Sequence, residues 1–174
     1  MKQTQITLNP LDIAVLLKIA STRNLSWQQK PLADALHLSQ SEISKSVARS
    51  KFARLLDPTG KKIMKLALLE FLQYGISYAF PQQPGAIVRG IPTAHSAEPL
   101  NQLLNSSENY VWPSGKGKVK GQSIIPLYPS VVEAVQNDKA LHEMLALVDA
   151  IRVGRVREKE LAIKELKKRI LDEK

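Results

Sequence analysis

Cysteine is absent from the 174 residues, which excludes disulfide bridges and metal sites built on thiolates. The absence also fits a protein that works in a reducing compartment. Long apolar runs are missing too, since none approaches the roughly 20 residues that a membrane helix needs. The N-terminal stretch MKQTQITLNP lacks the apolar segment of a signal peptide. We therefore expect a cytoplasmic protein without a membrane span.

Clustered metal ligands and catalytic groups are missing as well. The chain has three histidines, His37, His95 and His142, and none is paired with a second histidine or a carboxylate at metal-ligand spacing. Thr93, His95 and Ser96 could imitate part of a hydrolase site, but the glycines of a nucleophile elbow do not accompany them. We expect no enzymatic activity, no cofactor and no metal.

Acidic residues are scarce in the first half of the chain. The formal charge is +9, and residues 1–80 hold 11 Lys and Arg against 5 Asp and Glu, a net of +6. Residues 81–128 carry a net +2, and residues 129–174 a net +1. A generally basic protein would not show this asymmetry. A positive field concentrated on one part of the chain is expected of a module that attracts phosphates.

The most informative pattern spans Leu32 to Leu56 and predicts two short helices joined by a tight turn. Apolar residues recur at helical spacing as far as Leu36, and the pattern breaks at His37. Histidine tolerates a left-handed backbone better than most residues, so it can replace the glycine that is common in such a turn. Ser39 then begins the second helix, because Glu42 three residues later completes a capping box.

The second helix is predicted to have two different sides. Ile43 and Val47 give it one apolar stripe. The opposite side is polar and cationic, and carries Gln40, Ser41, Ser44, Lys45 and Arg49. Ser50 departs from the pattern, since a large aliphatic residue is usual at its position. A helix divided in this way, set at a sharp angle to the helix before it, is the element that enters a DNA major groove.

The order of residues 32–47, LADALHLSQSEISKSV, resembles the helix-turn-helix of winged-helix regulators of the MarR type. The wider chain is similar to a group of bacterial helix-turn-helix proteins. The strings that carry this similarity are ALLEFL at 67–72, RGIPTA at 89–94, PLYPSV at 126–131 and ALVDAIRVG at 146–154. The resemblance implies a winged helix with a dedicated C-terminal part and connects some members with neighbouring toxin genes. It implies no ligand.

A wing is predicted directly after the second helix. Asp57-Pro58-Thr59-Gly60 is a favourable turn string, and apolar residues flank it on both sides. Lys61 and Lys62 would stand just past the tip of the hairpin, where they and Arg54 can contact phosphates. The alternative is a plain loop between two helices, with solvated lysines.

Helical and extended segments are also predicted around this core. The first helix should begin at Asn9-Pro10 and close at Arg23-Asn24. An extended stretch, Leu25-Ser26-Trp27, follows, in which Trp27 is predicted to pack rather than to stack on bases. Residues 66–74 are apolar on most sides, so they should be buried, and in regulators of this type a second subunit commonly covers them. We therefore expect a homodimer.

Proline dominates the middle of the chain. Residues 75–128 hold six of the ten prolines, which prevents long helices. Short extended pieces are predicted at 76–80, 86–91, 110–112 and 118–125. Asn105-Ser106-Ser107 is predicted to be an exposed loop. A hairpin tip is predicted at Ser114–Gly117, within a Gly-Lys-Gly-Lys stretch that lacks the spacing of a phosphate-binding loop.

Lysines 116, 118 and 120 alternate along this part of the chain and would make one face of a strand cationic. Such a face is usually solvated; an auxiliary contact with nucleic acid or with an acidic partner is the alternative.

Helical patterns return after Pro129. A short helix is predicted over 130–136, a longer one begins at its cap Asp138 and breaks at Gly154, and a last helix covers 156–171. Acids nearly balance the bases of the last helix, and two of them stand four residues before a base, in the pairs Glu160–Lys164 and Glu165–Arg169. We therefore expect a solvated helix with one docking face rather than a DNA-binding arm.

These patterns predict a mainly α protein with small β elements. Residues 1–80 should form a winged helix-turn-helix DNA-binding domain, and residues 81–174 a proline-rich β/loop segment with C-terminal helices. The predicted function is that of a sequence-specific transcriptional regulator that binds double-stranded DNA as a homodimer on a two-fold-related site. The predicted contacts to DNA are Ser39, Gln40, Ser41, Ser44, Lys45, Arg49, Arg54, Lys61 and Lys62.

A second hypothesis belongs to a different class of protein. In it, the chain is an antitoxin or a protein-interaction scaffold whose C-terminal half binds a partner protein such as a toxin. The size and the apolar helices of that half, larger than dimerisation alone needs, favour this alternative. The charge asymmetry favours the DNA-binding regulator.

Overall fold

The computed structural model describes residues 2–23 and 26–172 and confirms a mainly helical fold with small β elements. Its helices are α1 (Pro10–Thr22), α2 (Gln29–Leu36), α3 (Gln40–Phe52), α4 (Lys65–Tyr74), α5 (Ile76–Ala79), α6 (Leu100–Leu103), α7 (Val131–Ala134), α8 (Lys139–Val153) and α9 (Val156–Leu171). Its strands are β1 (Ile87–Pro92), β2 (Tyr110–Pro113) and β3 (Val119–Ser123), with short 3-10 turns at Ala94–Ser96 and Val135–Asn137.

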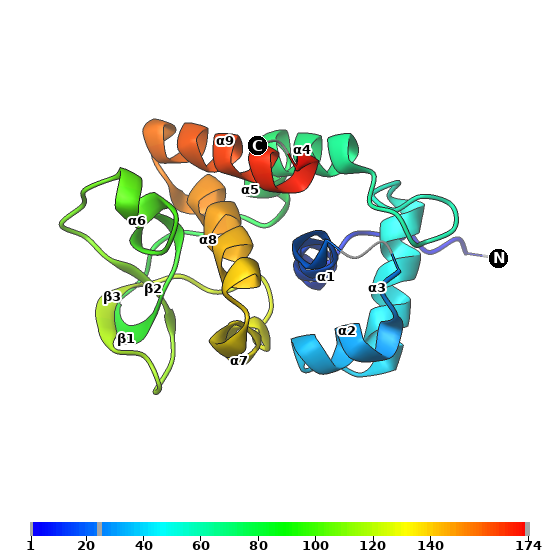
Figure 1. Ribbon diagram of the computed structural model, residues 1–174, viewed down its shortest axis with the longest axis horizontal. Coiled ribbons are helices and arrows are strands. Elements are labelled where there is room, and N and C mark those ends of the chain that lie inside the picture. The colour runs from blue at the N-terminus through cyan, green and yellow to red at the C-terminus, as the bar shows by residue number, and fades with distance from the viewer. Residues whose placement is uncertain (1, 24–25, 173–174) are drawn as a thin grey trace.

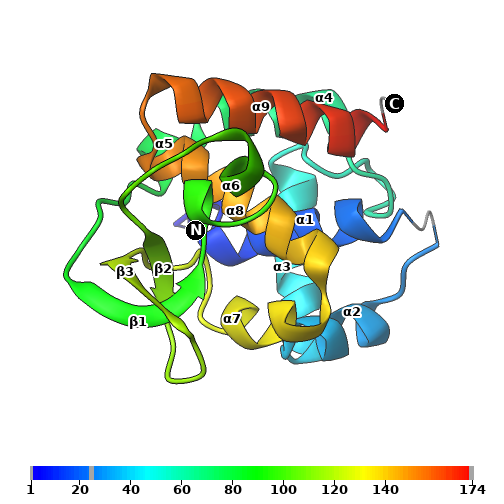
Figure 2. The same ribbon diagram turned by 60° about the vertical axis from the view of Figure 1, so that its left-hand side comes forward.

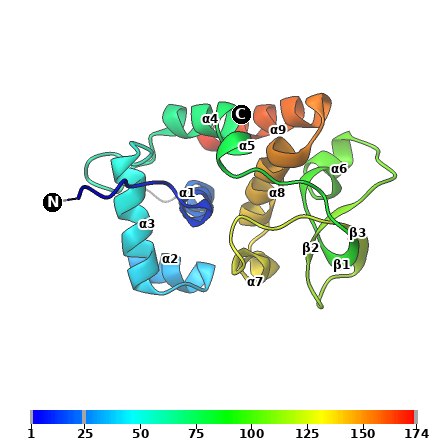
Figure 3. The same cartoon turned by 180° about the vertical axis from the view of Figure 1, so that it is seen from behind.

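Two helices occupy the middle of the molecule and separate its two ends. Helices α1 and α8 lie centrally, with α2 and α3 at one end and the three strands with α6 at the other (Figure 1). Helices α4 and α9 lie beside each other along one side, as the rotated views show (Figures 2 and 3). Helix α1 packs against α2 and α3 and also against α8 and α9, so it joins the two ends.

One hydrophobic core runs through the described chain. It includes Leu16 and Ile43 from the N-terminal helices and Leu147 and Leu166 from the C-terminal ones. The predicted domain boundary at residues 80/81 falls between α5 and β1, yet elements on both sides of it contribute to this core. Helices α2 and α3 are therefore supported by the C-terminal half.

The apolar segment that was predicted to lie under a second subunit is partly covered within the chain. Leu68, Leu69 and Leu72 of α4 are buried, and α9 packs against α4. Two large side chains of the segment remain exposed, Leu66 at 75% and Tyr74 at 68%, and so does Tyr78, at 86%, in the following α5. The homodimer therefore stays a prediction that depends on these exposed side chains.

One of the four predicted extended pieces is wrong. Residues 76–79 form the helix α5, because the chain turns at Gly75 and buries Ile76 completely. The hydroxyl of Ser77 donates to the carbonyl oxygen of Ile151 at 3.0 Å and so fastens α5 to α8. A helix of four residues is too short to show a periodic pattern, which explains the error.

The other three extended pieces become the strands of the sheet. The predicted turn at Ser114–Gly117 is present, but it does not close a simple hairpin, because β2 and β3 pair in parallel and both run antiparallel to β1. Gly90 makes this close arrangement possible, since a Cβ atom there would lie 2.0 Å from the carbonyl oxygen of Trp112.

The C-terminal helices follow the prediction. The carboxylate of Asp138 accepts the backbone N–H of Leu141 and so caps α8, which ends at Gly154. Helix α9 covers the predicted range. Within residues 2–23 and 26–172, no helix combines the length and the apolar character that a membrane span requires.

Candidate nucleic-acid interface

The turn between α2 and α3 has the predicted geometry. Helix α2 ends at Leu36, and the capping residue that follows, His37, has a φ of 55°, in the left-handed region. Ser39 caps α3: its hydroxyl accepts the backbone N–H of Glu42, while the Glu42 carboxylate accepts the backbone N–H of Ser39 at 2.8 Å. The capping box therefore fixes the point at which α3 begins.

A buried ion pair sets the position of α3 against α1. The Nε and Nη2 atoms of Arg49 donate to the two carboxylate oxygens of Asp12, each at 2.8 Å. Asp12 is fully buried, and it also accepts the backbone N–H of Asn9 at 2.8 Å. The hydrogen bonds with Asp12 raise the pKa of Arg49 above its ordinary value.

This ion pair corrects the assignment of Arg49 to the exposed, DNA-facing side of α3. Its side chain is only 20% exposed, and its guanidinium is committed to Asp12. The error arose because Asp12 lies 37 residues earlier in the chain, too far for a local pattern to show. We therefore remove Arg49 from the contacts that DNA could use.

The inner side of α3 is lined by small residues. Ile43, Ser46 and Ser50 are buried, whereas Val47, predicted to share the apolar stripe with Ile43, is only partly buried. The short serine side chains let α3 lie close to α1 and α2, which it contacts. The hydroxyl oxygens of Ser46 and Ser50 have no hydrogen-bond partner among the described residues.

The outer side of α3 carries an uninterrupted exposed surface, which we call the outer face. It contains the predicted residues Gln40, Ser41, Ser44 and Lys45, and also Ala48, Lys51 and Phe52. The last three were missed, although they follow Ser44 and Lys45 at helical spacing. The unusual Ser50 had obscured the register of this part of the helix.

The predicted wing is a turn closed by one bridge rather than a two-stranded hairpin. Leu56 and Ile63 form a single antiparallel bridge. Inside the turn, one carboxylate oxygen of Asp57 accepts the backbone N–H groups of Lys61 and Lys62 at 3.0 and 2.9 Å. Hydrogen bonds from the Lys62 backbone, from the Thr59 hydroxyl and from the Lys61 backbone, in that order, lower the pKa of Asp57 to about 2. The turn is therefore held by its own carboxylate.

Trp27 connects the wing to the helices behind it. Its Nε1 donates to the carbonyl oxygen of Lys61 at 2.8 Å, and the Lys61 ammonium lies 4.7 Å from the centre of the indole ring. Trp27 is buried, which confirms its predicted packing role. The predicted end of the first helix at Asn24 and the start of the extended stretch at Leu25 lie outside the described residues.

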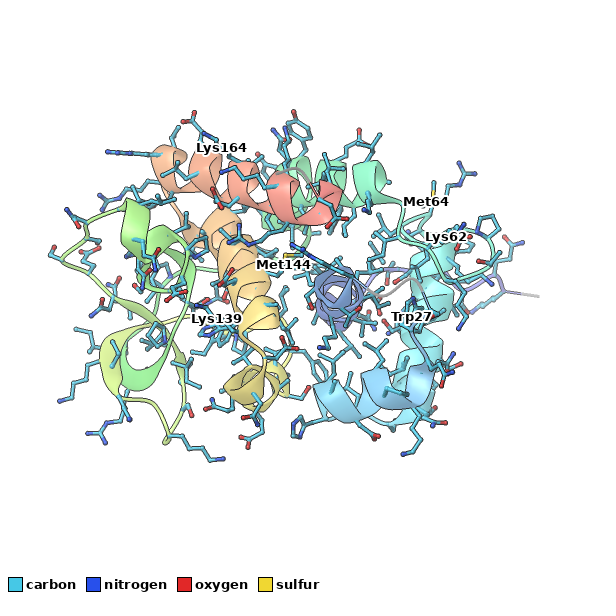
Figure 4. The ribbon with its side chains drawn as sticks, viewed as in Figure 1. Trp27, Lys62, Met64, Lys139, Met144 and Lys164 are labelled. Atoms are coloured by element: carbon cyan, nitrogen blue, oxygen red, sulfur yellow. The ribbon has the colours of Figure 1, made fainter. Side chains whose placement is uncertain are left out.

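Arg54 and Lys62, two of the predicted phosphate contacts, are exposed. Lys62 lies beside Met64 at the wing (Figure 4). Arg54 has a φ of 62° and directly follows the end of α3. The structure thus brings the predicted lysines and Arg54 to the same end of the molecule as the outer face.

The C-terminal half forms hydrogen bonds with both helices that flank the turn, α2 and α3. The Tyr128 hydroxyl donates to the Glu42 carboxylate at 3.0 Å, and the Ser130 hydroxyl donates to the carbonyl oxygen of Leu36 at 2.7 Å. Both residues lie in the PLYPSV string at 126–131. Hydrogen bonds from the Ser39 backbone, from the Ser39 hydroxyl and from Tyr128 lower the pKa of Glu42.

A buried polar cluster was not found from the sequence. The Asp149 carboxylate accepts hydrogen bonds from Thr93 and Trp112, each at 2.7 Å, and from Arg152 at 2.9 Å. Its residues come from the RGIPTA string, β2 and the ALVDAIRVG string. The cluster joins the sheet to α8 and is a structural element, because all four side chains are buried.

Two of the histidines also have structural roles. His95 Nε2 lies 2.8 Å from the carbonyl oxygen of Glu108, and His142 Nε2 lies 2.8 Å from that of Pro92.

Comparisons of the chain with models of protein families, with curated proteins and with solved structures find no match.

Proposed function

We propose that the protein is a sequence-specific transcriptional regulator that binds duplex DNA, with α3 in the major groove and the wing against the backbone. The observation that carries this proposal is the outer face of α3. Ser41, Ser44 and Ala48 run along it as short side chains, so the helix can approach the base edges closely. Lys45 and Lys51 flank this strip on either side.

The charges around the outer face support the proposal. Lys45, Lys51, Arg54 and Lys62 are exposed, and none forms an ion pair with the described part of the chain. Among the described residues the nearby acids form no ion pair with these four side chains: Glu42 accepts bonds from Ser39 and Tyr128, which lower its pKa with help from the charge of Lys45, and Asp57 accepts the N–H groups of the wing. The free positive charge is therefore available to phosphates.

Each group in this arrangement has a distinct task. Lys45 can donate to O6 and N7 of guanine, while Ser41 and Ser44 can bond to base edges. Arg54, Lys61 and Lys62 would hold phosphates on either side of the groove, as backbone contacts position a protein without reading sequence. Ser39 and Gln40, at the N-terminus of α3, would contact the backbone or the first base pair.

A dimer would let two copies of α3 contact successive turns of the major groove. We infer that the exposed Leu66, Tyr74 and Tyr78 meet their counterparts in a second chain, which gives a two-fold-related binding site. The alternative of an antitoxin whose C-terminal half binds a partner has less support, because α8 is buried almost throughout in the shared core.

The proposal is tested by measuring affinity for duplexes selected from a random pool and for random duplexes, across a salt series. Wild-type protein should show a steep loss of affinity with salt, because each neutralised phosphate releases counterions. Lys45→Ala should cost about 1–3 kcal/mol on the selected site and much less on random DNA. Lys62→Ala should weaken both alike and lower the salt slope by about one unit.

Lys164→Ala is the matched control, since Lys164 is an exposed lysine on α9, away from α3 (Figure 4). It should change neither affinity nor slope. A flat salt response of the wild type would remove the proposed function. Equal losses on selected and random DNA in Lys45→Ala would mean that α3 only grips the backbone.

A further inference from the structure

An apolar strip lies on the outer face of α3: at 100° per residue it runs from Ala48, in the middle of the face, to Phe52, which lies between Ala48 and Lys45. Ala48 is exposed, and the Phe52 side chain one turn later is 65% exposed, a large apolar surface for a helix that is otherwise polar outside. Helical side chains lean toward the N-terminus, so the Phe52 ring covers the turn that contains Ala48. The two residues therefore form one continuous contact surface.

The same strip forms one wall of a hollow between α3 and the wing. Apolar atoms of Leu56, Pro58 and Met64 complete its lining, and Lys51 and Arg54 stand among its polar members. Met64 is 44% exposed and lies at the wing near Lys62 (Figure 4). Asp57, the acid in the lining, is engaged by the N–H groups of the wing. The hollow is thus apolar, with unpaired cations around it.

The order of residues on α3 decides which part of DNA such a surface meets. At 100° per residue, Ala48 lies midway between Lys45 on one edge of the outer face and Lys51 on the other. If the two lysines are directed at phosphates or at the polar edges of guanine, the middle of the face meets the floor of the groove. Thymine is the base that presents an apolar group there, its 5-methyl group.

We propose that Ala48 and Phe52 contact thymine 5-methyl groups, so that the protein selects sites with thymine at defined positions in the major groove. This inference rests on the proposed function and names the base that the same site prefers. The Phe52 ring supplies apolar area, and the short Ala48 lets the methyl group reach the helix backbone. Lys45 and Ser44 then read the neighbouring base pairs.

The test uses the full-length protein and a duplex selected from a random pool. Each thymine of the selected site is replaced in turn by deoxyuridine, which removes only the 5-methyl group. Wild-type affinity should fall about fourfold at one or two positions, the size expected for one buried methyl-sized group at about 0.8 kcal/mol. Phe52→Ala should bind the thymine duplex more weakly and lose the difference between thymine and deoxyuridine at one of these positions.

The matched control is Ile125→Ala, which truncates an apolar side chain of the same exposed fraction, 65%, in the segment that follows β3. It should keep the wild-type response to deoxyuridine. If the wild-type affinity is unchanged by every deoxyuridine replacement, or if the selected site contains no thymine, the inference is overturned. This holds even if Phe52→Ala fails to fold. A Phe52→Ala protein that loses the same affinity for both duplexes also overturns it, since the ring would then contact sugars.

These outcomes separate the inference from the proposed function. If wild type binds no duplex, or binds without salt dependence, the proposed function fails. If binding is salt-dependent and Lys45→Ala loses the selected site, but deoxyuridine has no effect, the regulator remains and the thymine contact is wrong.

Discussion

Two helices, α8 and α1, each carry a buried aspartate that is bound by an arginine, and the two pairs differ in what they hold together. Asp149 and Arg152 lie one turn apart on α8, with side chains 2% and 5% exposed. Arg152 also donates to the carbonyl oxygens of Phe80 and Ile125, so the pair gathers distant segments around α8. Burial raises the pKa of Asp149, and Arg152, Thr93 and Trp112 oppose that rise.

Asp12 and Arg49 instead join two helices, α1 and α3, at the edge of the core. Asp12 is enclosed, while Arg49 is 20% exposed. This pair determines how α3 lies on α1, and therefore the direction in which the outer face of α3 points. One ion pair therefore supports the fold as a whole, and the other supports the orientation of the proposed DNA-binding helix.

Breaking the α8 pair should have the largest effect. Asp149→Ala leaves the charge of Arg152 buried without its partner and leaves Thr93 and Trp112 without their acceptor. Such a change should lower the free energy of unfolding by about 3–5 kcal/mol, measured by urea denaturation. Glu98→Ala, which breaks the exposed Lys139–Glu98 pair, is the control and should cost less than about 1 kcal/mol. If Asp149→Ala and Glu98→Ala lowered the free energy of unfolding equally, the Asp149 carboxylate would not be buried.

Breaking the α1–α3 pair should have a smaller effect on stability. Arg49→Ala leaves Asp12 with a single backbone donor, Asn9, and should cost about 2–3 kcal/mol of unfolding free energy. The double variant Asp12→Ala/Arg49→Ala should recover much of this loss, because no charge is left unpaired.

The same double variant tests whether Arg49 contacts DNA. Its salt slope for DNA should equal that of the wild type, whereas Lys62→Ala should lower the slope by about one unit. A lower slope in the double variant would show that Arg49 holds a phosphate after all.

Removing an unpaired hydroxyl on the inner side of α3 should stabilise the protein slightly. Ser50 is 1% exposed, and its hydroxyl has no partner among the described residues. Ser50→Ala should therefore raise the free energy of unfolding by about 1 kcal/mol, seen as a higher melting temperature. Ser44→Ala, on the outer face, should stay within about 0.5 kcal/mol of the wild type. A destabilised Ser50→Ala would mean that the hydroxyl is bonded.

Local signals account for what the sequence predicted well. The left-handed turn at His37, the Ser39–Glu42 capping box and the Asp138 cap each involve residues within a few positions of one another. Their physical cause is contained in a short window of sequence, so the helix ends around them could be predicted. The turn at Asp57 was found for the same reason.

Distant partners account for what the sequence did not show. The bond between Tyr128 and Glu42 spans 86 residues, and that between Asp149 and Thr93 spans 56. The parallel pairing of β2 with β3 also depends on β1, which precedes both strands in sequence and pairs antiparallel with each of them. No helical or alternating period in the sequence indicates such contacts. Phe52 could not be assigned to the outer face for a different reason: Ser50 makes the helical register of α3 uncertain after Val47.

The smallest effect on stability is expected in the wing, because the Asp57 carboxylate that holds the turn is exposed to solvent. The pKa of Asp57 is lowered from 3.8 to about 2, chiefly by the backbone N–H of Lys62. A carboxylate with a lowered pKa stabilises the folded turn at pH values above about 4, and this contribution is lost as the pH falls toward 2. The Asp57 carboxyl carbon, followed by NMR, should therefore titrate with a midpoint near 2, and the Lys61 and Lys62 amide signals should shift with it. Asp57→Asn assigns the signal, since it removes that titration. A midpoint near 4 would show that the carboxylate does not hold the wing, and the wing lysines would then lack the fixed position that the proposed phosphate contacts require.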